Sequence, residues 1–396
     1  MQMSKLFSPA PMGSVMLKNR MVHSATFECM AADDGSVTDP MVKRYKNLAK
    51  GGVGLIIPGY LYIAPRGKAF MGQAGIGDDR HIPGLKRLVD TVHEAGGRIA
   101  FQIAHGGRQS PKSLIGDAPL APCRFGRDPV SLNKPAAATK AEIAGVIDAF
   151  VRAAGRVRAA GADAVQLHCA HGYLLNEFLS PFFNRRHDRW GGSPENRFRV
   201  VRKIIEGIRQ EAGQDFPVLV KMNSEDFTPA AGIDPPLAAQ YAGWLAGLGV
   251  ASLEISSGTY FSFHTARGAV PIDELARGLP WWMRPIAKMI FKKQIDPCRF
   301  QPCYHLPAAE IIKPALGDVP LVLVGGVRQL DEMERILADG SADFLSMSRP
   351  FIREPFLAKR LKEGKTTEAA CISCNKCFAA IFNKMPLRCY ADGLPA

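Results

Sequence analysis

The sequence predicts an α/β protein: a (β/α)8 TIM barrel with a long insertion after strand six and a cysteine-rich segment at its C-terminal end. Three observations lead to this fold class. A glycine ends a helical pattern just before a short apolar run at several places, about eight such runs alternate with helical patterns, and the runs are continuously apolar. Continuous apolar strands are typical of a sheet covered on both faces. An open doubly wound sheet is the alternative.

The recurring joint between helix and strand is the clearest of these signals. Glycine directly after a helix tolerates the left-handed backbone that lets the chain turn back into a strand. The five copies are Lys50-Gly51-Gly52-Val53, Ala95-Gly96-Gly97, Ala160-Gly161-Ala162-Asp163, Leu248-Gly249-Val250-Ala251 and Asp339-Gly340-Ser341-Ala342.

The order of elements follows from these joints. The predicted strands begin near Met21, Val53, Ile99, Ala164, Val218, Ser252, Leu321 and Phe344. The helical patterns between and after them include Ala141–Arg158, Glu195–Glu211, Pro236–Leu248, Leu330–Ala338 and Phe356–Glu363. We therefore expect residues 1–365 to form the barrel and residues 366–396 to form a separate cysteine-rich tail.

Composition excludes several classes of protein. The chain has 396 residues and a formal charge of +13, but its basic residues are scattered and lack the aromatic interleaving of a nucleic-acid surface. A solvated basic face, or attraction of small molecules that carry phosphate, explains the charge. No apolar run is long enough to cross a bilayer, and Met1 to Pro11 has no signal-peptide core, so we expect a cytoplasmic protein.

Two segments fall outside the barrel rhythm. The predicted insertion, Tyr260 to Tyr304, is too long for an ordinary connection, and its stretch Leu279–Lys293 mixes aromatic with basic residues. We expect a helix that packs on the barrel or on a second subunit, and a membrane-surface helix is the alternative.

The tail carries four cysteines with the spacing C-x2-C-x2-C-x11-C: Cys371, Cys374, Cys377 and Cys389. Four thiolates suit a [4Fe–4S] cluster or, alternatively, Zn²⁺.

Polar residues follow most of the predicted strands, at the end where barrels carry their active sites. They are Gln102, His105, His168, His171, Lys221, Ser256, Ser257, Gly325, Gly326, Ser348 and Arg349. Taken singly, several have plain structural interpretations: His105 could cap a turn, Lys221 could be half of a buried ion pair, and the glycines could be turn residues.

The pair His168 and His171 carries more information than either residue alone. Three residues apart on a turn that leaves a strand, both rings can aim at one point and bind an anion or polarise a carbonyl oxygen. Metal binding is the rival interpretation, although no carboxylate stands at ligand spacing. Tyr173 adds a phenol that could donate a proton.

Gly325, Gly326 and Arg349 follow the last two strands, where barrels commonly bind phosphate. Backbone N–H groups and a guanidinium at that place would hold a cofactor phosphate. A phosphate there and a proton donor after strand four leave room between them for a flat cofactor.

Together these residues resemble the Old Yellow Enzyme family, and more closely its branch that contains 2,4-dienoyl-CoA reductase and trimethylamine dehydrogenase. The resemblance covers residues 5–365. The matching stretches are Leu17-Lys18-Asn19-Arg20, Gln102-Ile103-Ala104-His105-Gly106-Gly107-Arg108, His171-Gly172-Tyr173-Leu174-Leu175-Asn176-Glu177-Phe178-Leu179-Ser180-Pro181, Asn184-Arg185-Arg186, Asp188 and Trp190-Gly191-Gly192-Ser193-Pro194-Glu195-Asn196-Arg197.

The resemblance implies an FMN-binding barrel that is reloaded by NADH or NADPH and reduces the activated C=C bond of an α,β-unsaturated carbonyl or enoyl thioester. It implies flavin-ring contacts from Ala25, Thr26, Gly59 and Gln102, with Lys221 near N1 and C2=O. It implies a phosphate site made by Gly325, Gly326, Ser348 and Arg349. His168 and His171 would hold the substrate carbonyl, and Tyr173 would protonate the α-carbon. Phe27-Glu28 departs from the Thr or Cys that the family often has there.

Other functions remain open from the sequence. The tail resembles the iron–sulfur segment of the two named relatives, so a flavin-dependent dehydrogenase or demethylase could pass electrons through the cluster to a partner protein. A flavin-free lyase would use Lys221 to form a Schiff base, and a basic binding module would recruit nucleic acid or membrane. The sequence does not distinguish a monomer from a homo-oligomer.

Overall fold

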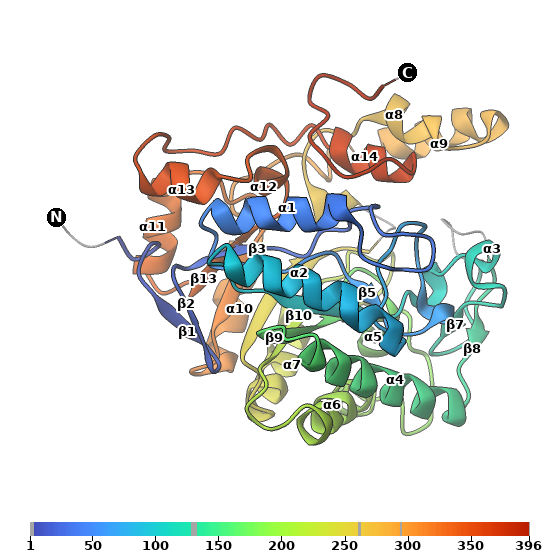
Figure 1. The fold of residues 1–396 in the computed structure, drawn as a ribbon. Coiled ribbons are helices and arrows are strands. Elements are labelled where there is room, and N and C mark those ends of the chain that lie inside the picture. Colours follow the sequence, from blue (N-terminus) through green and yellow to red (C-terminus); the bar gives the residue numbers. More distant parts are fainter. Residues whose placement is uncertain (1–3, 128–132, 260–262, 294, 396) are drawn as a thin grey trace.

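The computed structural model describes residues 4–127, 133–259, 263–293 and 295–395 (Figure 1). Tyr260, where the predicted insertion starts, and the terminal residues Met1 and Ala396 lie outside this set. Within the described ranges no helix has both the length and the apolar character needed to cross a membrane.

A ring of parallel strands forms the centre of the molecule, as predicted. The strands are hydrogen-bonded in the order β4-β3-β13-β12-β11-β10-β9-β6-β5, and a bridge between Ile56 and Ile99 joins β4 to the start of β6. The strands of the wall are β3 (Met21–His23), β4 (Leu55–Ile56), β6 (Ala100–Ala104), β9 (Ala164–Cys169), β10 (Val218–Glu225), β11 (Ser252–Ser257), β12 (Leu321–Val324) and β13 (Phe344–Met347). The extra strand β5 (Leu61–Tyr62), which pairs with β6, was not predicted.

Helices cover the outside of this ring (Figure 1). They are α1 (Asp39–Lys50), α2 (Ile82–Glu94), α4 (Lys140–Ala159), α6 (Pro194–Glu211), α7 (Pro235–Gly247), α10 (Leu306–Leu316), α11 (Leu330–Ala338) and α13 (Leu357–Lys362). The five helical ranges predicted from sequence correspond to α4, α6, α7, α11 and α13. The predicted glycine joints are confirmed as well, because φ is positive at Gly52, Gly96, Gly161, Gly249 and Gly340.

The interior of the barrel has two kinds of layer. The hairpin of β1 (Ala10–Met12) and β2 (Val15–Leu17) packs against an apolar layer at the N-terminal ends of the strands. One step further along the strands the inward-facing side chains become polar: Gln102, Gln166, Lys221, Glu254 and Ser346. Strand alternation therefore places this polar layer on an apolar floor.

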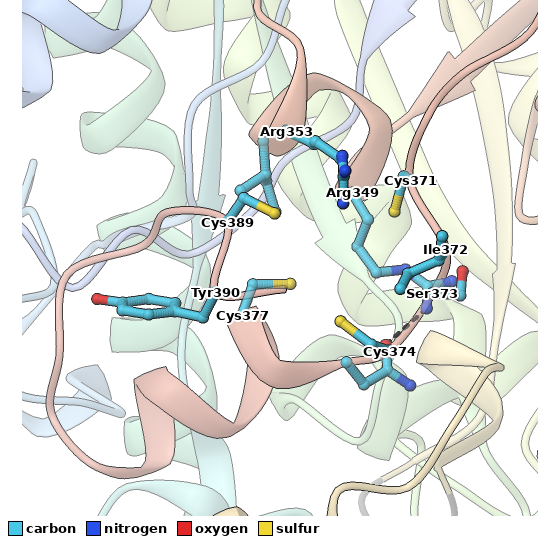
Figure 2. Close-up of a pocket in the computed structure, with 11 residues that line it drawn as sticks. Arg349, Arg353, Cys371, Ile372, Ser373, Cys374, Cys377, Cys389 and Tyr390 are labelled. Atoms are coloured by element: carbon cyan, nitrogen blue, oxygen red, sulfur yellow. Dashed lines mark hydrogen bonds between the residues drawn. The ribbon is translucent and has the colours of Figure 1, made fainter. Parts of the chain in front are cut away.

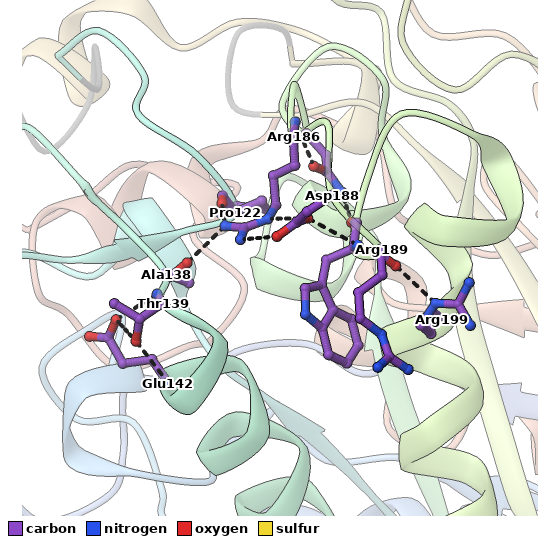
Figure 3. Close-up of polar contacts among 10 residues, drawn as sticks. Pro122, Ala138, Thr139, Glu142, Arg186, Asp188, Arg189 and Arg199 are labelled. Atoms are coloured by element: carbon purple, nitrogen blue, oxygen red, sulfur yellow. Dashed lines mark hydrogen bonds and ion pairs between the residues drawn. The ribbon is translucent and has the colours of Figure 1, made fainter.

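The long matching stretch after Tyr173 has a structural role in its second half. Arg186 binds the Asp188 carboxylate with Nε at 2.9 Å and Nη2 at 2.6 Å, while its Nη1 donates to the carbonyls of Pro122 and Ala138 (Figure 3). The Ser193 hydroxyl then caps α6 by accepting from the backbone of Asn196. This part of the stretch joins the segment before α4 to the start of α6 and supplies no group to the barrel interior.

The insertion lies at the side of the barrel together with the tail (Figure 1). It contains α8 (Ile272–Arg277), the short helix η5 (Trp281–Met283) and α9 (Arg284–Lys292). Of the two expected partners, the barrel does not cover this helix: α9 packs along α8, and none of its residues is buried, while packing on a second subunit stays a prediction. In the tail, α12 (Arg349–Arg353) follows β13, and α14 (Lys376–Phe382) packs against α8.

Candidate active site

A buried ion pair organises the polar layer of the barrel. Lys221 Nζ lies 3.3 Å from Glu254 Oε1 and donates to Ser24 Oγ at 2.7 Å, and the two charged side chains are only 5% and 1% exposed. The interpretation of Lys221 as half of a buried ion pair is therefore confirmed. A lysine that forms a Schiff base must first be uncharged, so this pairing argues against the lyase alternative.

Amide groups extend this network around the barrel. Gln102 Nε2 donates to Gln166 Oε1 at 2.7 Å, and Gln166 Nε2 donates to Glu254 Oε2 at 3.0 Å. The amide of Gln102 thus turns its carbonyl oxygen away from Gln166. An ammonium has three protons, and two of those on Lys221 point to Ser24 and Glu254. Gln102 can therefore present its carbonyl oxygen as an acceptor, and Lys221 its third proton as a donor, to a heterocycle that lies above them.

The two predicted histidines meet after β9. Their ring centroids are 5.0 Å apart, and His171 Nε2 lies 2.7 Å from Ser256 Oγ. The Nδ1 atom of His168 is buried and has no hydrogen-bond partner among the described residues. Burial, reinforced by the positive charge of Lys221, holds the pKa of both rings well below the usual value. Both imidazoles are therefore neutral at pH 7.

Tyr173 lies beside the histidines and is hydrogen-bonded to a residue that the sequence did not single out. Its hydroxyl donates to Tyr60 Oη at 2.7 Å, and its ring centroid is 4.9 Å from that of His168. Burial raises the pKa of both tyrosines. Tyr173 is thus protonated and can act as a proton donor.

The residues after β3 form another side of the site. Thr26 Oγ1 lies 2.6 Å from Ser348 Oγ, so two predicted contacts from opposite ends of the chain meet, and Ala25 packs on the apolar floor. Gly59 faces Glu28: its N–H donates to Glu28 Oε1 at 2.7 Å, and a Cβ on Gly59 would lie 2.3 Å from Glu28 Oε2. The glycine is needed for this close approach.

Glu28 gives a testable pH dependence. Burial raises its pKa from 4.5 to about 7, against the opposing effects of the Gly59 N–H and Arg44. Between these values the unfolded chain loses a proton that the folded chain keeps, so folding stability falls as the pH rises through this range, by about 3 kcal/mol in total. Glu28→Gln should accordingly stabilise the protein at pH 8 and leave it nearly unchanged at pH 4, as measured by urea denaturation. An equal effect at both pH values would contradict this assignment.

The predicted phosphate corner is tightly packed. A Cβ on Gly325 would lie 2.6 Å from the Tyr304 ring, and a Cβ on Gly326 would lie 2.5 Å from the carbonyl oxygen of Gln301, so the end of the insertion covers both glycines. Arg349 Nη1 donates to the Arg267 carbonyl at 2.8 Å and to Asn375 Oδ1 at 2.6 Å. The guanidinium therefore lies between the end of β13, the insertion and the tail.

The four predicted cysteine ligands line one pocket, together with Arg349 (Figure 2). Their side chains come from both ends of α14 and point toward a common space. All four are free thiols, and burial raises the pKa of Cys377 to about 12. Within the described ranges no three His, Cys, Asp or Glu side chains are arranged to hold a single metal ion, and this applies equally to the pair His168 and His171.

Sequence reasoning missed three members of the site: Tyr60, Gln166 and Glu254. A usable signal existed for the last two, because each stands two positions before a residue that was singled out, His168 and Ser256, and thus faces the same interior. His105, in contrast, fulfils its structural interpretation, since its Nδ1 accepts from the Gly107 N–H at 3.0 Å.

Comparison with known proteins agrees with this geometry. The model of the NADH:flavin oxidoreductase / NADH oxidase family matches residues 5–277 and 263–368. The chain is 34% identical to an NADH oxidase of Thermoanaerobacter brockii, covering 97% of this chain and 55% of that protein. It is 33% identical to a 4,4′-dithiodibutanoate disulfide reductase of Rhodococcus erythropolis, covering 95% and 93%.

Among solved structures, a 2-naphthoyl-CoA reductase in complex with 2-naphthoyl-CoA superposes with a TM-score of 0.85 at 27% identity, covering 98% of this chain and 56% of that one. The chain thus spans little more than half the length of two of these proteins and nearly all of the disulfide reductase. The family model matches most of the chain, so this chain belongs to the NADH:flavin oxidoreductase family.

Proposed function

We propose that the protein uses NADH or NADPH and FMN to reduce the C=C bond of an α,β-unsaturated carbonyl compound or enoyl thioester. The observation that carries this proposal is the grouping of a protonated phenol and two neutral imidazoles above a buried lysine and glutamine. The thioester is included because the superposed 2-naphthoyl-CoA reductase is complexed with a thioester.

The polar layer fits a flavin. The carbonyl oxygen of Gln102 and the remaining proton of Lys221 would face polar groups of the isoalloxazine, and Thr26 would flank the ring. Gly325, Gly326, Ser348 and Arg349 would hold the phosphate once the Tyr304 ring and the Gln301 carbonyl, which cover the two glycines, move aside. The bound flavin supplies hydride transfer from the nicotinamide to the alkene, and the protein supplies orientation and electrostatics.

The side chains around the substrate have distinct tasks. His168 would donate from Nδ1 to the substrate carbonyl oxygen, which satisfies its unpartnered buried nitrogen, and His171 would do so from the other side. Polarisation of the carbonyl makes the β-carbon electron-poor. Tyr173 would then turn its hydroxyl away from Tyr60, to which it donates in the structure, and deliver its proton to the α-carbon.

Two half-reactions test this function under anaerobic conditions. The purified protein should be yellow, NADH or NADPH should bleach it, and an enone or enoyl thioester should restore the colour. A protein that binds no FMN, or a reduced protein that neither class of alkene reoxidises, would refute the proposal.

Phenols provide a direct test of the histidine pair, because a phenolate oxygen resembles the substrate carbonyl oxygen. Replacing His168 with Ala should weaken the binding of a phenol by roughly 1–3 kcal/mol, the cost of an unpaired buried acceptor. The change in flavin absorbance on titration gives the dissociation constant. Replacement of His93, which pairs with Asp163 on the outside of the barrel, is the control and should leave phenol binding unchanged. Equal affinity in the His168 variant would remove this residue from the site.

We also propose that Cys371, Cys374, Cys377 and Cys389 hold a [4Fe–4S] cluster. A zinc ion needs sulfurs about 2.3 Å from one point, whereas a cluster binds each thiolate to a separate iron. The resemblance of the C-x2-C-x2-C-x11-C spacing to an iron–sulfur segment favours the cluster. Anaerobic preparation should yield iron and acid-labile sulfide in equal amounts. Cys374→Ser should lower both contents, and the control Cys123→Ser should leave them unchanged. Stoichiometric zinc would refute the cluster.

The position of the cysteine pocket supports one alternative function, a dehydrogenase that passes electrons to a partner protein. Arg349 lines the cysteine pocket and also belongs to the proposed phosphate site, so a cluster there would lie near the flavin. An amine or alcohol dehydrogenase that delivers electrons to a partner protein would use this proximity. It predicts flavin reduction by the substrate without nicotinamide, and it fails if only NADH or NADPH bleaches the flavin.

A further inference from the structure

The insertion exposes an apolar surface, which we call the tryptophan face: Trp281, Trp282, Ile286, Met289 and Ile290. Trp281 is 79% exposed and Trp282 is 61% exposed, and the other three side chains are each more than half exposed. Burial of large apolar side chains is favourable, so five of them left in water within ten consecutive residues mark an interaction surface.

Helical spacing explains how this face forms. Trp282, Ile286 and Met289 are separated by four and three residues, so they lie along one side of the helix. Met283 and Ala287 are half-buried on another side, where α9 packs along α8. The helix therefore already uses one face within the fold and keeps a second apolar face free of the barrel (Figure 1).

Basic residues accompany the tryptophan face. From Arg277 to Arg299 the sequence has six basic residues, Arg277, Arg284, Lys288, Lys292, Lys293 and Arg299, and one acidic residue, Asp296. Lys288 pairs with Asp273 of α8 at 2.6 Å, and Arg284 donates to the carbonyls of Leu279 and Arg277, so part of this charge is used within the insertion. Lys292 and Lys293 are exposed at the end of α9.

We propose that the tryptophan face docks the protein on the surface of a lipid bilayer that contains anionic phospholipid. Tryptophan favours the boundary between headgroups and acyl chains, and neighbouring lysines are attracted to anionic headgroups. The same face of a second copy fits less well, because the one acidic residue of this stretch, Asp296, already pairs with Arg299 and leaves Lys292 and Lys293 no partner charge there. Docking of this kind needs no membrane-spanning helix, and it does not depend on the proposed reaction.

Co-sedimentation of the intact flavoprotein with vesicles tests this proposal. The protein should bind vesicles of phosphatidylcholine with phosphatidylglycerol, and bind weakly to phosphatidylcholine alone. Trp281→Ser with Trp282→Ser should abolish binding. Lys292→Gln with Lys293→Gln should lower the partition coefficient roughly fivefold for each lysine removed, and added salt should reduce binding of the wild type more than that of this variant.

Matched controls test whether vesicle binding depends on the tryptophan face or on the total number of exposed apolar and basic side chains. Met16→Ser with Ile311→Ser removes two exposed apolar side chains elsewhere, and Arg202→Gln with Lys203→Gln removes an adjacent basic pair on α6. Both should bind vesicles like the wild type. Failure of the wild type to bind anionic vesicles, or an equal loss in the controls, would overturn the proposal. So would a dimer in solution that the double tryptophan substitution dissociates, because the face would then be a subunit interface.

Discussion

Replacing Tyr173 with Phe should slow reoxidation of the reduced protein by an enone by roughly 10²–10⁴-fold, the usual contribution of a general acid. The hydroxyl is the proton donor in the proposed reaction, and burial keeps it protonated. Reduction of the flavin by NADH or NADPH requires no proton from Tyr173 and should keep its wild-type rate. Anaerobic stopped-flow absorbance of the two half-reactions measures both rates separately.

Tyr241→Phe is the matched control for this experiment. Tyr241 is also a buried tyrosine with a hydrogen bond, donated to the Leu179 carbonyl at 2.8 Å, but it lies on α7 and faces the end of α5 (Leu174–Leu179). Its loss should affect stability and leave both half-reactions intact. If Tyr173→Phe reoxidises as fast as the wild type, the α-carbon receives its proton from another source.

Lys221→Met should lower the free energy of unfolding by about 3–5 kcal/mol, because it leaves a buried carboxylate without its counter-charge. Glu254 would keep its hydrogen bonds from Ser24, Gln166 and Ser346 but lose the ammonium. Urea denaturation of the flavin-free protein measures this effect without a contribution from cofactor binding.

The double variant Lys221→Met with Glu254→Gln gives the comparison. It removes both charges, so it should recover much of the lost stability, since replacing a whole buried ion pair is often nearly neutral. If the free energy of unfolding of Lys221→Met lies within about 1 kcal/mol of the wild-type value, Glu254 becomes neutral at little cost. The ion pair then contributes little to the stability of the fold.

The barrel was predictable from sequence because its signals are local. A glycine with positive φ at a joint such as Gly161 and an apolar run such as that after Ala164 each depend on a few neighbouring residues. The strand β5 was missed because two residues, Leu61 and Tyr62, are too short to show a pattern. The packing of α9 along α8 was not predicted because an amphipathic pattern shows that a helix has an apolar face and does not show what covers that face.

The site was predictable only in part, for a related reason. His168, His171 and Tyr173 stand close together in the sequence, and their grouping survives in the structure. The contact of Lys221 with Glu254 depends on the pairing of β10 with β11, and Tyr173 and Tyr60 come from two connections far apart in the sequence. The role of Glu28 likewise depends on how closely Gly59 approaches it, which its place in the chain does not reveal.

The hydrogen bonds between the tail and the barrel have a practical consequence for protein engineering. Asn375, inside the cysteine run, accepts from Arg349, and the Leu387 N–H donates to the Glu28 carbonyl at 2.8 Å. A minimal catalyst trimmed before Cys371 would lose both anchors. Shortened libraries for directed evolution should therefore retain the chain through Leu387.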